Sequence, residues 1–238
     1  MSKIIFVKKK IDSFKKKISV PGDKSLSIRW VLFSSLAKGT SKAKNLLLSE
    51  DVLAAIKAIK KLGIKVIIKK KECTIYGKGV DGYKYKRNLK INAQNSGTLG
   101  RLILGLLINS PEPIYLVGDK SLSKRDFKRV SDPLSKFGAK FKLRNNSFLP
   151  LKIYGSPKLK PIKYFENKGS AQCKSSIIFA AMRTDGTTTI KAKKSRNHTE
   201  LLCKHLKLPI KIKNKKNFDE IQIKKEKKIN TLNYNIPS

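Results

Sequence analysis

Three short segments of this chain place small polar residues directly before an apolar run, which is a pattern typical of a helix start. They are Gly22-Asp23-Lys24-Ser25, Asn95-Ser96-Gly97-Thr98 and Lys168-Gly169-Ser170-Ala171-Gln172. The first turn of a helix offers unpaired N–H groups and the positive end of the helix dipole, so it can bind phosphate or carboxylate groups. For Ser25, Asn95 and Ser170, each taken alone, the simpler interpretation is that the side chain only caps its own helix.

The arginines of the chain favour the anion-binding interpretation. Lysine and arginine together number 55, and only a few of these are arginine, at positions 29, 87, 101, 125, 129, 144, 183 and 196. A guanidinium is a planar fork that can hold a phosphate or carboxylate with two hydrogen bonds. Arg29, Arg101, Arg125 and Arg196 lie in helix-start or loop motifs, and we expect the other four on the solvated surface.

The helix starts recur because the chain contains three similar units. Each start leads into an apolar helix, a strand, a second helix and two more strands, which predicts a βαβαββ unit repeated three times. Such a unit buries its apolar face against its neighbours. The predicted first helices lie at 28–36, 102–108 and 177–182, and the second at 51–62, 130–137 and 199–206. An ordinary α/β domain with chance internal similarity is the alternative.

The second helices carry stop signals at matching places. Gly63 and Gly138 follow the first two, where a left-handed C-cap residue is favoured, and Lys207 stands there in the third as a weaker stop. Strands are predicted after each stop, at 64–68 and 74–76, at 140–143 and 149–154, and at 210–212 and 221–223.

The net charge of +39 permits non-specific binding to nucleic acid or to an anionic membrane. The lysines are nevertheless spread along the whole chain without interleaved aromatic residues, so we expect neither a specific nucleic-acid partner nor a membrane partner, and read the lysines as a compositional bias. Cys73, Cys173 and Cys203 have no metal-binding spacing, so no metal or cofactor is expected and a reducing compartment is indicated. Without a signal peptide or a spanning segment, the sequence predicts a cytoplasmic protein.

Five motifs together resemble the 3-phosphoshikimate 1-carboxyvinyltransferase (EPSP synthase) family of enolpyruvyl transferases. In chain order they span residues 21–29, 95–101, 118–125, 168–175 and 196–200, and they cover nearly the whole chain. They include the Gly-Asp-Lys-Ser turn with Arg29 four residues beyond, Asn-Ser-Gly-Thr with Arg101, and the Arg-Asn-His-Thr-Glu run from Arg196. The five in order are a far stronger signal than any one alone. The resemblance implies an inside-out α/β barrel domain, with helices inside and sheets outside.

The resemblance also implies site residues. For shikimate-3-phosphate these are Lys24, Ser25, Arg29, Ser170, Ala171, Gln172 and Arg196, and for phosphoenolpyruvate Lys24, Gly97, Arg125 and Gln172. Lys24 would lie between both substrates as the catalytic residue, and Asn95, Thr98 and Arg101 would shape the loop. The implied reaction is attack of the 5-hydroxyl of shikimate-3-phosphate on C2 of phosphoenolpyruvate, followed by loss of phosphate.

The same family sets expectations about what lies outside this chain. Its acid–base groups lie in a second, homologous domain, and residues 234–238 resemble the point where the family's chain crosses into it. We therefore expect residues 21–238 to form the shikimate-3-phosphate-binding domain, with residues 1–20 carrying a strand that the family shares with the second domain. Two departures stand out: Asp126 replaces proline, which could loosen its loop, and Asn197 replaces aspartate. His198 and His205 are read as structural.

Three alternatives remain at this point. The sister family transfers enolpyruvate to UDP-N-acetylglucosamine, but it lacks a match to Arg29 and carries a reactive cysteine near the loop at 121–123. A truncated or decayed binding domain would keep the fold without catalysis. A basic nucleic-acid binder would show salt-dependent binding to DNA that shikimate-3-phosphate does not affect.

Overall fold

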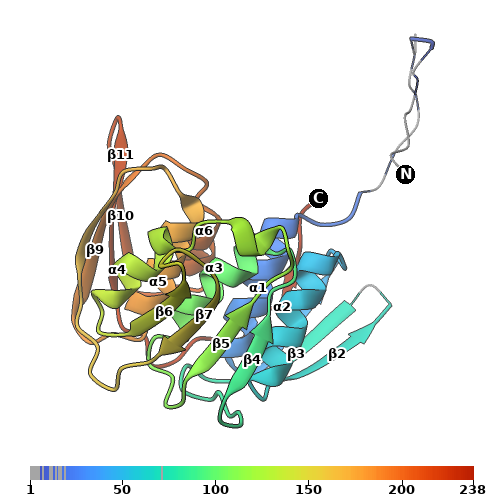
Figure 1. Ribbon diagram of the computed structural model, residues 1–238. Helices are drawn as coiled ribbons and strands as arrows, with labels where there is room; N and C mark the ends of the chain where they lie inside the picture. Colours follow the sequence, from blue (N-terminus) through green and yellow to red (C-terminus); the bar gives the residue numbers. More distant parts are fainter. Residues whose placement is uncertain are drawn as a thin grey trace.

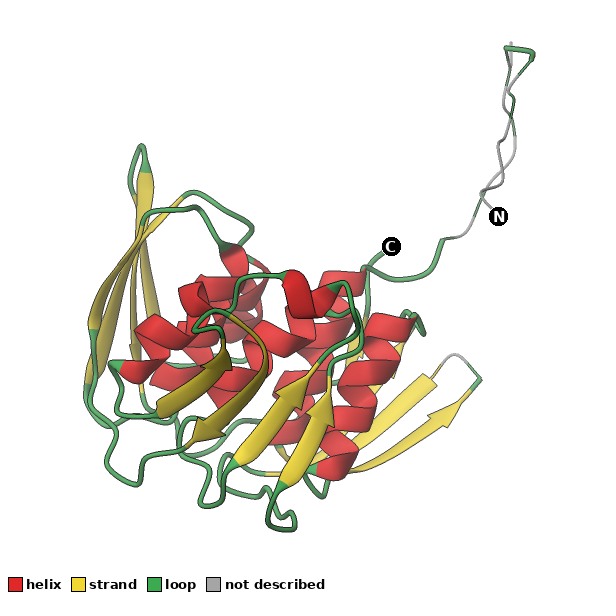
Figure 2. Cartoon of the chain, in the orientation of Figure 1, coloured by secondary structure: helices red, strands yellow, loops and turns green. Residues whose placement is uncertain are grey.

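The computed structural model describes residues 20–70 and 72–238, together with residues 6, 8–10, 13, 15 and 18. Three four-stranded sheets surround a group of helices, as Figure 1 and Figure 2 show. The helices are α1 (Lys24–Leu36), α2 (Glu50–Lys61), α3 (Gly97–Leu106), α4 (Lys128–Ser135), α5 (Ala171–Ala181) and α6 (His198–His205). The predicted α/β fold with helices inside and sheets outside is confirmed.

Each sheet repeats one topology, with a parallel first pair of strands and antiparallel pairs after it. The first sheet has the order β12 (Tyr234–Asn235), β1 (Lys38–Lys44), β3 (Glu72–Lys78), β2 (Lys65–Lys69). The second has β4 (Leu89–Asn92), β5 (Ile114–Val117), β7 (Phe148–Tyr154), β6 (Lys140–Arg144). The third has β8 (Lys163–Glu166), β9 (Thr187–Lys193), β11 (Phe218–Lys224), β10 (Ile210–Asn214). This confirms the threefold βαβαββ repeat.

The leading strand of the first unit comes from the far end of the chain. β12 pairs in parallel with β1, where Ala43 lies opposite Tyr234. The two ends of the repeat region also meet, because the Asp23 N–H donates to the Pro237 carbonyl at 2.7 Å and the Ser238 hydroxyl donates to the Val20 carbonyl at 2.9 Å. The strand expected within residues 1–20 is not tested, because most of that segment lies outside the described residues.

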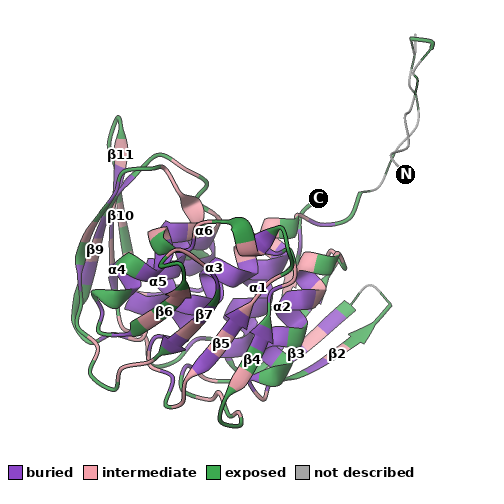
Figure 3. Ribbon diagram, viewed as in Figure 1, coloured by how far each residue is buried: buried purple, intermediate pink, exposed green. Residues whose placement is uncertain are grey.

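The inner helices are α1, α3 and α5, and they are buried on nearly all sides (Figure 3). Ser27 to Leu36 of α1 is buried without a break. A helix that is apolar or small all round fits a protein interior, because no face needs water. The outer helices α2, α4 and α6 keep one exposed side. The predicted stops after them are confirmed: Gly63, Gly138 and Lys207 have φ of 87°, 116° and 55°.

At the far ends of the inner helices, the predicted exposure of one arginine is wrong. The Arg183 side chain, expected on the solvated surface, is only 5% exposed. Its Nε donates to Asn109 Oδ1 at 2.7 Å and its second amino group lies 3.2 Å from Asp81 Oδ1. Burial lowers the pKa of the guanidinium, against opposing effects of Tyr83 and Asp81. In the described part of the chain, no helix is long and apolar enough to cross a membrane.

Two inner helices touch backbone to backbone at Gly105. A Cβ at Gly105 of α3 would lie 2.1 Å from the carbonyl oxygen of Ser176 in α5. Gly105→Ala should therefore destabilise the fold by about 1–3 kcal/mol through overpacking, although alanine favours a helix by up to about 1 kcal/mol. Urea unfolding measures this change. Gly79→Ala is the matched control, because nothing lies within 4 Å of that position; its φ of 88° gives a penalty from backbone strain alone. A Gly105→Ala chain as stable as the wild type would contradict the helix contact.

Candidate functional site

A cavity of about 490 Å³ opens where the inner helices begin. The first two residues of each inner helix line it: Lys24 and Ser25 of α1, Gly97 and Thr98 of α3, and Ala171 and Gln172 of α5. Arg29, Asn95, Arg125 and Arg196 complete the predicted lining residues, and Glu50 and Asp51 also contribute. Three positive helix ends thus face one space, as an anion site requires.

The capping interpretation is wrong for two of the three predicted positions. Asp23 caps α1 by accepting from the Leu26 N–H, and Ser96 caps α3 by accepting from the Leu99 N–H. Ser25 and Asn95 are therefore free to face the cavity. Only Ser170 acts as a cap, accepting from the Cys173 N–H at 3.2 Å, and it does not line the cavity.

Arg29 is a buried cation whose hydrogen bonds all go to neutral groups. Its Nε donates to Thr199 Oγ1 at 2.7 Å, one amino group to Ser175 Oγ at 3.1 Å, and the other to the carbonyl and hydroxyl of Ser25. The residue is 2% exposed. Burial lowers its pKa to about 10, against opposing effects of Glu200 and Asp23. It therefore stays charged at neutral pH, with no carboxylate in contact.

Arg101 lies behind the cavity and ties the inner helices together. It donates to Gln172 Oε1 and, at 3.2 Å, to the Asp126 carbonyl, while Gln172 Nε2 donates to Thr98 Oγ1 at 3.0 Å. Burial, and then the nearby Arg129 and Arg125, lower the pKa of Arg101 to about 10. The Gln172 amide is thereby held in one orientation between α3 and α5.

Arg125 and Asn95 form the edge of the cavity on the loop side. Arg125 donates to Asn95 Oδ1 at 3.1 Å, and a Cβ at Gly97 would lie 3.3 Å from Arg125 and 3.4 Å from Arg101. Glycine at 97 therefore gives both guanidinium groups room beside a bare backbone. Asp126, expected to loosen this loop, accepts from the Lys128 N–H at 2.7 Å at the start of α4.

Two acidic residues in the cavity were missed by sequence reasoning. Glu50 and Asp51 begin α2, and Asp51 Oδ2 lies 3.5 Å from Lys24 Nζ. Acids are ordinary in the first turn of a helix, so their position alone gave no signal. The lining holds four cations (Lys24, Arg29, Arg125, Arg196) and these two acids, and 4 − 2 leaves an excess of two positive charges.

A buried ion pair lies next to the residues that hold Arg29. Lys174 Nζ and Glu200 Oε1 are 2.6 Å apart, with side chains 0% and 3% exposed. Lys174 precedes Ser175 in α5, and Glu200 follows Thr199 in α6, so the pair joins the two helices at the residues that bond Arg29. Asn197 stands directly before α6 and makes no side-chain cap bond to it. The described residues contain no cluster of His, Cys, Asp or Glu that could hold a metal.

Comparison with known proteins gives one consistent result. Residues 8–238 match the family model for EPSP synthase (3-phosphoshikimate 1-carboxyvinyltransferase). The chain is 41% identical over 234 residues to the 3-phosphoshikimate 1-carboxyvinyltransferase of Caldicellulosiruptor bescii, covering 96% of this chain and 53% of that protein. It is 42% identical over 206 residues to the enzyme of the same name from Streptococcus agalactiae, covering 86% and 48%.

The solved structures agree. The EPSP synthase of Acinetobacter baumannii superposes with a TM-score of 0.86 at 33% identity, over 94% of this chain and 50% of that one. A second structure of that enzyme gives 0.87 at 34%. The chain thus spans about half the length of the relatives it matches. By its sequence and its fold, this chain belongs to the EPSP synthase family.

Proposed function

We propose that this chain supplies the shikimate-3-phosphate-binding half of a 3-phosphoshikimate 1-carboxyvinyltransferase. The observation that carries the proposal is Arg29, a buried guanidinium with only neutral partners at the floor of a cation-lined cavity. A buried charge without a counter-ion is costly, and a dianionic phosphate in the cavity would offset that cost. The three helix starts add further donors to the same space.

The lining residues divide between the two substrates. Ser25, Arg29, Ala171 and Arg196 bind shikimate-3-phosphate, with Ser170 holding the start of α5 from behind. Gly97 and Arg125 bind phosphoenolpyruvate on the loop side, and Gln172 faces both ligands. Asn95, Thr98 and Arg101 fix the positions of Arg125 and Gln172 through the hydrogen bonds described above.

The reaction joins the two anions and expels a third. The 5-hydroxyl of shikimate-3-phosphate loses its proton as its oxygen bonds to C2 of phosphoenolpyruvate, and a proton adds to C3. The C2–O bond to phosphate then breaks, phosphate leaves, and a proton leaves C3 to form the enol ether. This chain's contribution is to hold both anions close together and to offset their charge. Lys24 lies between the two substrates, near the attacking hydroxyl and phosphoenolpyruvate, with Asp51 Oδ2 at 3.5 Å from its Nζ.

A second homologous domain completes the site. The relatives are about twice as long as this chain, and the acid–base groups implied by the family are not among the lining residues. We therefore expect the chain alone to bind shikimate-3-phosphate without turning it over. A domain that has kept this fold and lost catalysis is the alternative.

Calorimetric titration of shikimate-3-phosphate into the purified chain at modest salt tests the proposal. We expect saturable binding that is lost in the Arg29→Ala/Gln172→Ala variant and kept in Arg87→Ala, a control with an exposed arginine away from the cavity. Circular dichroism establishes that each variant is folded. A folded wild-type chain that does not bind, or that binds UDP-N-acetylglucosamine instead, would contradict the proposal. Steady product formation by the chain alone would contradict the need for a second domain.

A further inference from the structure

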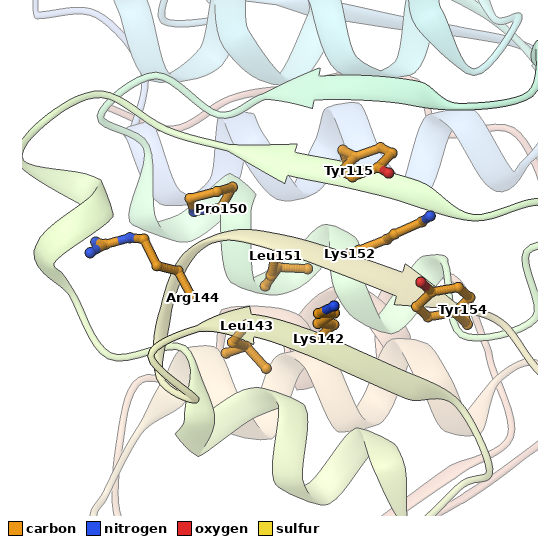
Figure 4. Close-up of a pocket in the computed structure, with 8 residues that line it drawn as sticks. All are labelled: Tyr115, Lys142, Leu143, Arg144, Pro150, Leu151, Lys152 and Tyr154. Carbon is orange, nitrogen blue, oxygen red and sulfur yellow. The ribbon is translucent and has the colours of Figure 1, made fainter.

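The outer face of the second sheet carries a shallow cationic groove, away from the inner helix starts. Two adjoining cavities of about 340 and 580 Å³ share Lys142 and Tyr154 and run along β6 and β7. Tyr115 of β5, Lys152 of β7 and Lys142 of β6 lie in register as one row across the sheet. Figure 4 shows the Lys152 side chain extending between Tyr115 and Tyr154.

The cations of this groove have no acidic partners. Lys140, Lys142, Arg144 and Lys152 line it, and none of its lining residues is acidic. Lys142 lies directly opposite Lys152 across the strands, an arrangement in which like charges destabilise a sheet. Within the described part of the chain, none of these four forms an ion pair. An anion bound along the groove would relieve that repulsion.

Aromatic rings alternate with these charges. The Lys152 ammonium lies 4.8 Å from the centre of the Tyr115 ring and 5.0 Å from that of Tyr154. Arg144 is held in place, because Nε donates to the Leu149 carbonyl and an amino group to the Ser123 carbonyl, both at 2.7 Å. The groove therefore combines flat aromatic surfaces with a guanidinium held by two hydrogen bonds and with lysine ammonium groups.

We propose that this groove binds single-stranded nucleic acid without sequence specificity. Bases stack on aromatic rings whatever their identity, and lysines along the same groove neutralise the phosphates. Base stacking is stronger than a cation–π contact at an exposed site, so a base can displace Lys152 from a tyrosine ring and leave it free for a phosphate. Duplex nucleic acid keeps its bases stacked on each other, and therefore should bind less tightly.

This groove could not be predicted from the sequence, because its residues come from separate segments of the chain. Tyr115 lies far along the chain from Lys152, and only the register of β5, β7 and β6 makes them neighbours. The third sheet repeats the arrangement, with Lys191 lying 5.5 Å from the Phe165 ring and 4.1 Å from the Phe218 ring. We therefore expect removal of the groove's side chains to weaken binding without abolishing it.

Fluorescence anisotropy with a labelled oligonucleotide of about six nucleotides, within the length that one OB-fold covers, tests the proposal. Tyr115→Ala/Tyr154→Ala should weaken binding about tenfold or more at fixed salt while the salt dependence stays unchanged. Lys142→Gln/Lys152→Gln should lower the slope of log affinity against log salt by about 1.4, because each phosphate of a single strand that a lysine neutralises adds about 0.7 to that slope.

Lys57→Gln/Lys204→Gln is the matched control, since it removes the same charge from two exposed helix positions outside the groove. Melting temperatures establish that all variants are folded. The proposal is overturned if this control weakens binding as much as the groove variants do. It is also overturned if the tyrosine variant binds as tightly as the wild type, or if duplex or anionic vesicles bind more tightly than the single strand.

Discussion

Glu200→Gln should lower the free energy of unfolding by about 3–5 kcal/mol, the range measured when one partner of a buried ion pair is removed. The substitution leaves Lys174, 0% exposed, as a cation without a counter-ion in the interior. Water cannot reach it, and the neighbouring groups of α5 and α6 offer no second carboxylate among the described ion pairs. Chemical denaturation at neutral pH measures the change.

The control for this prediction separates loss of charge balance from loss of packing. Lys174→Met/Glu200→Leu removes both charges and keeps similar volumes, so it should recover most of the lost stability. The Glu200 Oε2 atom has no hydrogen-bond partner, so the native pair itself contributes little net stability. If the double variant is as unstable as Glu200→Gln, packing rather than charge explains the loss.

Arg29→Lys should weaken shikimate-3-phosphate binding by about 30-fold or more, corresponding to a loss of at least about 2 kcal/mol. Lysine keeps the charge but cannot reproduce the fork that bonds Ser25, Ser175 and Thr199 together. The ammonium would also lose the orientation that those three residues impose. Calorimetry at modest salt measures the affinity.

Arg87→Lys is the paired control, because Arg87 is 81% exposed and forms only a surface ion pair with Glu112. It should bind shikimate-3-phosphate like the wild type. Unchanged affinity in a folded Arg29→Lys chain would show that a positive charge suffices and that the fork has no part in binding.

The sequence predicted the repeat well because each unit signals its elements locally. Apolar runs at helical spacing and left-handed residues at 63, 138 and 207 mark helices and their ends without any help from distant residues. β12 was beyond such reasoning, because a two-residue strand has no pattern of its own and forms only by pairing with β1.

The cavity residues were likewise predictable where the signal was local and not where it depended on packing between units. Ten of the predicted residues line it, since the motifs fix the first turn of each inner helix and the repeat brings those turns together. Ser170 and Arg101 do not line the cavity; Ser170 caps α5, and Arg101 donates a hydrogen bond to Gln172. Glu50, Asp51 and the Lys174–Glu200 pair could not be predicted, because an acid in a first turn and a charge inside a helix each have an ordinary solvated interpretation. Only the packing of the units against one another places the two acids in the cavity and buries the ion pair.

The pairing of β12 with β1 has a consequence for how the protein is made. Ribosomes extend chains at about 5–20 residues per second, so Ala43 emerges about 10–40 seconds before Tyr234, the residue it lies opposite. During that interval β1 has an open edge with exposed donors and acceptors, which can pair with other chains. Of the three units described here, the first to be synthesised is thus the last to be completed. A chaperone that shields that edge on nascent chains should raise the yield of folded protein.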